Sequence, residues 1–135
     1  MNIIPFPERE QWPALLARPV LEAKDIEVIF RVDEKVKDLR LDMESRRDFF
    51  LIFKEAVNNI AKYSQARNTE IEITVHAHRL VMQIKDNGIG FDVLEADSGN
   101  GLTNMRKRAE SLRGHLTIDS VPGIGTKVRL EAPLT

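Results

Sequence analysis

The chain has 135 residues, of which 42% are hydrophobic and 30% are charged, and these are proportions of an ordinary soluble globular domain. Its 20 basic and 21 acidic residues leave a formal net charge of -1, so the charge gives no indication of a nucleic-acid partner. The absence of cysteine excludes disulfides, thiolate chemistry and sulfur-bound zinc. No apolar run reaches membrane-spanning length and the start does not resemble a signal peptide, so we expect a cytoplasmic protein without direct membrane contact.

The first half of the chain predicts a peripheral segment, a strand and a long helix. Prolines interrupt residues 1–24, where we expect at most a short helix around residues 8–18. Residues 25–32 alternate apolar and polar side chains, which predicts a strand. From about Met43 to Tyr63 apolar side chains recur every three or four residues, as they do in an amphipathic helix.

The second half begins with two neighbouring strands, predicted from the alternation in residues 69–78 and 79–86. A polar, glycine-rich stretch follows over residues 87–101, and a second helix is expected over residues 102–114, ending at a glycine.

The chain then closes with a hairpin formed by residues 115–120 and 125–133. This order of elements predicts an α/β fold. We expect a two-layer α/β sandwich in which the helices cover one face of a mixed, mainly antiparallel sheet.

The polar face of the long helix carries groups that suit magnesium and phosphate. Glu55, Asn58, Asn59 and Lys62 fall within about 100° of arc on the helical wheel. Mg²⁺ prefers hard oxygen ligands and retains several waters, so one amide oxygen and substrate phosphates suffice to hold it. Lysine supplies a point charge for phosphate oxygens. The alternative is an ordinary solvated helix face.

The segment KDNGIG, residues 85–90, has two interpretations. Asn-Gly is a strong signal for a tight hairpin turn. However, no alternating strand follows at once, and the next residues bring more glycines and then a helix start near Gly101. Such a start directs free N–H groups at an anion, and Asp86 could lie beneath a base and accept a hydrogen bond from its amine. These features favour a nucleotide pocket over the turn.

Four segments in order resemble the ATP-binding domain of sensor histidine kinases, within the wider group of ATPases that includes the gyrase and MutL types. Residues 54–64 (KEAVNNIAKYS) are similar to its N box and residues 86–92 (DNGIGFD) to its first glycine box. Residues 99–114 (GNGLTNMRKRAESLRG) resemble the second glycine box and residues 123–128 (GIGTKV) the last glycine motif. The form of the second box resembles the subgroup with the nitrate-sensor type of dimerisation domain. The resemblance covers roughly residues 25–133 and implies a Bergerat-type ATP-binding fold.

The resemblance implies a base-binding end. Asp86 would accept a hydrogen bond from the adenine amine, while Gly88 and Gly90 would let the chain pass close to the nucleotide. Thr126 would approach the adenine end from the final hairpin.

It also implies a phosphate end with ATP and Mg²⁺ as cofactors. Asn59 would ligate Mg²⁺, with Asn58 as its neighbour, and Glu55 would orient the metal's water. Lys62 and Tyr63 would face the phosphates, although many relatives have histidine in place of Tyr63. Glu55, Asn59 and Lys62 are thus the expected catalytic residues, and Asn59 and Glu55 the expected metal-binding residues.

The second glycine box would complete the nucleotide site. Gly99, Gly101 and Leu102 would border the phosphates at the end of a short lid, about residues 92–100.

A phosphoacceptor is missing from the sequence. A histidine kinase needs a histidine on a dimerising helix, but His76, His78 and His115 fall in predicted strands. We therefore expect residues 25–135 to be a catalytic domain and residues 1–24 to be the connector from an absent dimerisation domain. The expected partners are that histidine-bearing domain and, downstream, a response regulator; the chain alone is expected to be a monomer.

Three functions compete at this point. The first is transfer of the γ-phosphoryl group of ATP to a histidine on the separate dimerisation domain, which requires positioning and charge stabilisation more than covalent chemistry. The second is a serine kinase of the anti-sigma-factor type, which shares the motifs. The third is a degenerate domain kept as an interaction module, against which the retained motif residues argue.

Overall fold

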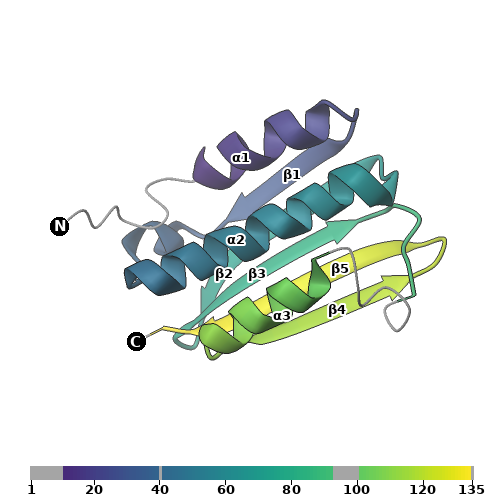
Figure 1. Ribbon diagram of the computed structural model, residues 1–135. Coiled ribbons are helices and arrows are strands. Elements are labelled where there is room, and N and C mark those ends of the chain that lie inside the picture. Colours follow the sequence, from purple (N-terminus) through teal and green to yellow (C-terminus); the bar gives the residue numbers. More distant parts are fainter. Residues whose placement is uncertain (1–10, 40, 93–100, 135) are drawn as a thin grey trace.

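The computed structural model describes residues 11–39, 41–92 and 101–134. Helices lie on one face of a five-stranded sheet, which gives two layers (Figure 1). In chain order the elements are α1 (Gln11–Glu22), β1 (Glu27–Val32), the 3₁₀ helix η1 (Glu34–Asp38), α2 (Met43–Asn59), the π-helix η2 (Ile60–Ser64), β2 (Asn68–His76), β3 (Arg79–Asp86), α3 (Leu102–Ser111), β4 (His115–Val121) and β5 (Gly125–Pro133). The predicted two-layer α/β sandwich is confirmed.

The sheet has the strand order β1-β2-β3-β5-β4. β1 runs parallel to β2, and every other neighbouring pair is antiparallel. A parallel pair needs a long crossover between its strands, and here α2 and its flanking short helices supply it. This crossover places α2 across the middle of the sheet, where its side chains meet the central strands (Figure 1).

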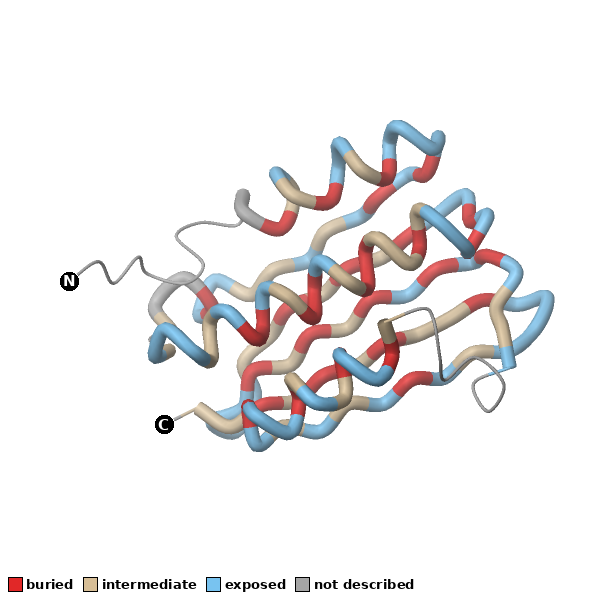
Figure 2. The backbone as a smooth tube through the Cα atoms, in the orientation of Figure 1, coloured by how far each residue is buried: buried red, intermediate tan, exposed pale blue. Residues whose placement is uncertain are grey.

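The core lies between the helices and the sheet, because the central strands alternate buried positions with partly or fully exposed ones. Ile84 on β3 and Leu130 on β5 face the helices and are almost completely buried, as are Phe49 and Phe53 on α2. Figure 2 shows the same alternation along the strands and the exposed outer side of α3. Apolar burial on one face and polar exposure on the other is what a half-covered sheet requires.

α1 corrects the prediction for the start of the chain. The helix extends past Arg18 to Glu22 and contains Pro19. Pro19 is exposed, so water can satisfy the carbonyl that a proline leaves without its helical donor. Ala17 and Leu21 are fully buried in the common core, so α1 packs as part of this domain. Its role as a connector to another domain stays a prediction.

The end of α2 is wound more loosely than the rest of the helix. After Asn59 the chain continues as η2, and Gln65 then adopts the left-handed conformation with φ of 54°. Wide turns of this kind occur often at functional sites. This one changes the direction in which Tyr63 and Ser64 project.

Candidate functional site

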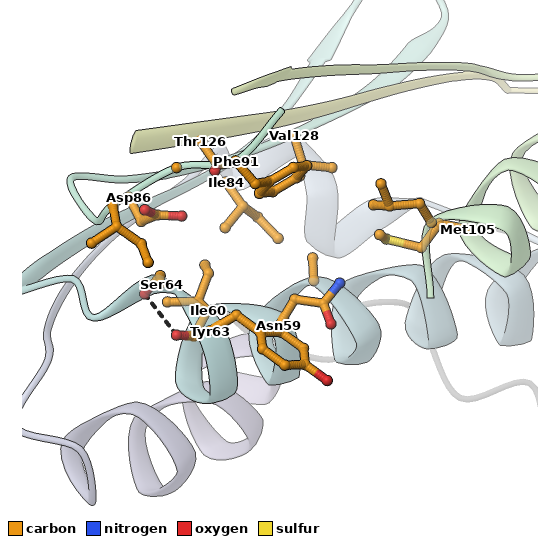
Figure 3. Close-up of a pocket in the computed structure, with 14 residues that line it drawn as sticks. Asn59, Ile60, Tyr63, Ser64, Ile84, Asp86, Phe91, Met105, Thr126 and Val128 are labelled. Carbon is orange, nitrogen blue, oxygen red and sulfur yellow. Dashed lines mark hydrogen bonds between the residues drawn. The ribbon is translucent and has the colours of Figure 1, made fainter. Parts of the chain in front are cut away.

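A cavity of about 420 Å³ lies between α2 and η2 on one side and β3, β5 and the start of α3 on the other. Its size is within the range of small-molecule sites. We call it the main cavity, and its lining residues are Ala56, Asn59, Ile60, Tyr63, Ser64, Ile84, Asp86, Ile89, Gly90, Phe91, Leu102, Met105, Thr126 and Val128. In Figure 3, Asp86 and Met105 lie at opposite ends of it. Most of these side chains are apolar, which suits a flat ring system with a few polar edges.

Asp86 is the buried carboxylate of the main cavity. It ends β3 and is 5% exposed. Its Oδ1 accepts a hydrogen bond of 2.8 Å from the N–H of Gly88. Burial raises the pKa of this carboxyl above its ordinary value, while hydrogen bonds from the backbone N–H groups of Gly88 and Thr126 act in the opposite direction. A buried carboxylate at the edge of an apolar cavity is suited to accept a hydrogen bond from a ligand amine.

The loop after β3 is held in place by the backbone on both of its sides. The N–H of Ile89 donates to the carbonyl of Ser64 at 2.7 Å, and the N–H of Gly123 donates to the carbonyl of Ile89 at 2.6 Å. A Cβ at Gly88 would overlap the carbonyl oxygen of Ser64, so only glycine fits there. Gly90 has a φ of +65° and would overlap a second backbone carbonyl. The loop therefore forms the floor of the cavity, and the hairpin interpretation of KDNGIG is wrong.

A pair of hydroxyl groups supports the adjacent wall. The Oγ of Ser120 on β4 lies 2.7 Å from the Oγ1 of Thr126 on β5. The same Ser120 oxygen accepts a hydrogen bond of 2.8 Å from the N–H of Phe91. Thr126 lines the main cavity, and Ser120 holds both Thr126 and the backbone of Phe91 in place. The role of Thr126 toward adenine stays a prediction.

The residues of α2 and η2 predicted for the phosphate and metal end do not all lie together. Asn59 and Tyr63 line the main cavity, with Tyr63 51% exposed at its opening. Glu55 and Asn58 instead line a smaller groove of about 170 Å³ between α2 and α3. Lys62 is exposed and is not among the described residues that line either space.

This smaller space, the α2–α3 groove, is polar. Lys54, Asn104 and Arg108 complete its walls with Leu51 and Met105. At its side the Nη1 of Arg108 lies 3.4 Å from Oδ1 of the buried Asp48, which joins the two helices.

The start of α3 lies directly over the end of this groove. Gly101 caps the helix in the left-handed conformation with φ of 81°, and a Cβ there would overlap the side chain of Glu55. Leu102 is buried and lines the main cavity. Gly99 and most of the predicted lid lie outside the described residues.

Apart from Leu102, the apolar lining was not identified as a site from the sequence. Ile84 and Val128 alternate in their strands as any core residue would, and Met105 follows the helical apolar pattern. Only Ser64 carried a signal, because it follows Lys62 and Tyr63 in the N-box segment. In the structure the Oγ of Ser64 donates to the carbonyl of Ile60 at 2.6 Å (Figure 3).

The side chains near Asn59 indicate which kind of metal ion could be held there. Across the described residues no cluster of three histidine, cysteine or acidic side chains is placed to hold a metal ion. A site with Asn59 as its amide ligand would therefore take most of its oxygens from a phosphate-bearing ligand and from water, which is how Mg²⁺ is commonly held.

Comparison with known proteins decides the family. The model for the histidine kinase-, DNA gyrase B- and HSP90-like ATPases matches residues 44–135. The chain belongs to this ATPase family. The matched part of the domain contains both faces of the main cavity and every predicted site residue.

Its relatives include sensor kinases. The chain is 32% identical over 114 residues to the signal transduction histidine-protein kinase/phosphatase DegS of Bacillus subtilis, covering 82% of this chain and 30% of DegS. It is also 32% identical over 108 residues to the sensor protein VraS of Staphylococcus aureus, covering 79% of this chain and 31% of VraS. The chain thus spans about a third of the length of these relatives.

Solved structures of low sequence identity show the same fold. The histidine kinase domain of a blue-light activated kinase from Erythrobacter litoralis superposes with a TM-score of 0.77 at 18% identity, covering 93% of this chain and 60% of that one. The catalytic domain of histidine kinase ThkA gives a TM-score of 0.74 at 18% identity, covering 97% of this chain and 93% of that one.

The ATPase family, predicted from the motifs, is therefore confirmed, as is the fold. The relatives DegS and VraS fit the predicted resemblance to sensor histidine kinases. The roles of the individual site residues and the boundary at residue 25 stay predictions. Within the described part of the chain, no helix is both long and apolar enough to cross a membrane.

Proposed function

We propose that this chain binds ATP with Mg²⁺ in the main cavity and transfers the γ-phosphoryl group to a histidine supplied by another domain. The observation that carries the proposal is the buried Asp86 at the apolar end of the cavity, next to Thr126. A carboxylate there accepts a hydrogen bond from the adenine amine, and the apolar side chains of Ile60, Ile84 and Phe91 surround the ring.

The phosphates then extend toward Asn59 and the start of α3. Asn59 supplies an amide oxygen to Mg²⁺, and the metal, when bound, neutralises charge on the phosphates. The N–H groups at the start of α3 point to the same end and favour an anion. Glu55 and Asn58, in the adjacent α2–α3 groove, lie close enough to this end to orient water around the metal.

The position of the histidines supports an acceptor from outside the domain, because none of the three lines the main cavity or the α2–α3 groove. Asp86 pairs with Thr69 and Thr126 at one end of the sheet, whereas His76 pairs with Arg79 at the other end of β3. The length of β3 separates the two ends by about 23 Å, at ~3.3 Å per residue. His78 follows in the same turn, and His115 starts β4 opposite Glu131, also away from Asp86.

Labelled ATP tests the transfer. We expect the chain with Mg²⁺ to transfer label to an added dimerisation domain that carries the histidine, and we expect chelation of Mg²⁺ to abolish the transfer. Phosphohistidine is labile in acid and phosphoserine is not, so acid treatment separates the histidine kinase from the serine kinase. Acid-stable label on a protein substrate, or tight nucleotide binding without any transfer, would contradict the proposal.

A further inference from the structure

Thr69 on β2 is a buried polar residue that the site described so far does not use. It has no exposed surface. Its Oγ1 is the one buried side-chain oxygen or nitrogen in the described part of the chain that has no hydrogen-bond partner. Native proteins rarely leave such a group unsatisfied, and each case calls for an explanation.

The sheet register places this hydroxyl beside the base-binding carboxylate. Thr69 lies directly opposite Asp86, Asp86 lies opposite Thr126, and Thr126 lies opposite Ser120. These residues form a polar row across β2, β3, β5 and β4 on the face covered by the helices. Except for Thr69, each member of the row has a hydrogen-bond partner in this structure.

Packing alone does not explain a threonine at this position. The next inward-facing residues of β2 are Ile71 and Ile73, and a valine would fill the space of Thr69 with the same branched shape. Because valine has no hydroxyl, it would also avoid the cost of burying one without a partner. If the residue served only to pack the core, threonine would therefore stabilise the fold less than valine would.

The distance across the pair allows a contact. Directly opposed residues of an antiparallel pair have Cβ atoms about 4.5–5.5 Å apart, so rotation of the two side chains can bring a hydroxyl to a carboxylate oxygen. The Oδ1 of Asp86 already accepts from Gly88. A carboxylate has room for further donors on its two oxygens.

We propose that Thr69 is a positioning residue for nucleotide recognition, whose hydroxyl donates to the Asp86 carboxylate while that group accepts from the amine of the bound base. This inference rests on the proposed function. It assigns Thr69 the task of holding the carboxylate ionised and oriented when the ligand displaces water from the cavity. The hydroxyl then has a hydrogen-bond partner in the nucleotide-bound state and none in the free state.

The test compares Thr69→Val with the matched control Thr69→Ser, which keeps the hydroxyl. Calorimetric titration with adenosine diphosphate should show an affinity about tenfold weaker for the valine variant and within about threefold of the unmodified chain for the serine variant. The affinity for inosine diphosphate, whose base lacks the amine, should change by less than about twofold in the valine variant. Thermal unfolding of the free valine variant should occur at an equal or higher temperature.

The outcomes separate a positioning role from a structural one. Unchanged binding of adenosine diphosphate by Thr69→Val would overturn the proposal, and so would equal loss for both nucleotides together with a lowered unfolding temperature. If Thr69→Val does not fold, Thr69→Ala takes its place, with the same predicted contrast between the two nucleotides. If the unmodified chain does not bind adenosine diphosphate, the proposed function itself fails.

Discussion

Asp86 shows how one residue can be unfavourable for the fold and yet suited to a binding site. Its carboxyl is 5% exposed, and burial raises its pKa. The N–H of Gly88 offsets part of that cost through a 2.8 Å hydrogen bond. A ligand amine would offset more of it, because hydrogen bonds to ionised groups are stronger than those between neutral groups.

The raised pKa of Asp86 predicts how stability depends on pH. A carboxyl whose pKa is higher in the folded than in the unfolded state stabilises the fold at low pH, and this contribution is lost as pH rises through the folded pKa. We therefore expect Asp86→Asn to have a higher free energy of unfolding than the unmodified chain at neutral pH. The difference in free energy between the two proteins should become smaller toward acid pH. Denaturant unfolding across pH measures both; a variant less stable at neutral pH would contradict the account.

Gly88 gives a prediction about space. A Cβ added at Gly88 would overlap the backbone carbonyl of Ser64. This carbonyl accepts a hydrogen bond from the N–H of Ile89 and therefore cannot move away. We expect Gly88→Ala to lower the free energy of unfolding by about 2 kcal/mol or more. Gly123→Ala is the control, because it meets no atom within 4 Å and its φ of +83° adds only backbone strain, about 1 kcal/mol. Equal losses in the two variants would show that the floor of the cavity is not tightly packed.

Some of these residues were predictable from the sequence and others were not. Asp86 and Asn59 stood out because a carboxylate before a glycine loop and an amide on a polar helix face have chemical uses. Phe91 and Ile84 did not, since nothing in a sequence distinguishes an apolar side chain that lines a cavity from one in the core. Thr69 looked like any strand threonine, and only the register with Asp86 gives it meaning.

At the scale of elements, the strands and helices follow the apolar periodicity closely. β3 matches its predicted range, whereas β2 begins one residue before its predicted range and ends two residues before the predicted end, because Ala77 and His78 form the turn. α2 with η2 covers the predicted helix from Met43 through Tyr63. The change to a π-helix after Asn59 was not predicted, because it spans only five residues, Ile60–Ser64, too few for the wider turn to show in the apolar pattern. It matters for the site, since η2 directs Tyr63 and Ser64 to the main cavity.

The turn between β2 and β3 predicts a gain in stability. Ala77 and His78 have φ of 51° and 60°, which is the conformation of a type I′ turn and favours Asn-Gly. We expect the double substitution Ala77→Asn and His78→Gly to raise the free energy of unfolding by about 1 kcal/mol. Denaturant unfolding measures the change. Because the turn lies at the far end of β3, nucleotide affinity should stay the same; a loss of stability would contradict the turn assignment.

At the scale of the whole molecule, the alternating strands predicted a sandwich but not its strand order. β5 inserts between β3 and β4, and β1 joins the edge in parallel. Alternation indicates which face of a strand is buried, but it does not indicate which strand lies beside it. The resemblance to the kinase family supplied the expected fold, and the described structure then showed how that order brings Asp86, Thr126 and Asn59 around one cavity.

Calorimetric titration of adenosine diphosphate and a non-hydrolysable ATP analogue, with and without Mg²⁺, tests the central claim most directly. The account predicts binding to the unmodified chain, tighter binding of the analogue with Mg²⁺, and an affinity reduced roughly a hundredfold in Asp86→Asn. The control Asp119→Asn, at an exposed position of β4, should bind as the unmodified chain does. Undiminished affinity in Asp86→Asn, or no binding by the unmodified chain, would contradict the assignment of the main cavity as the nucleotide site.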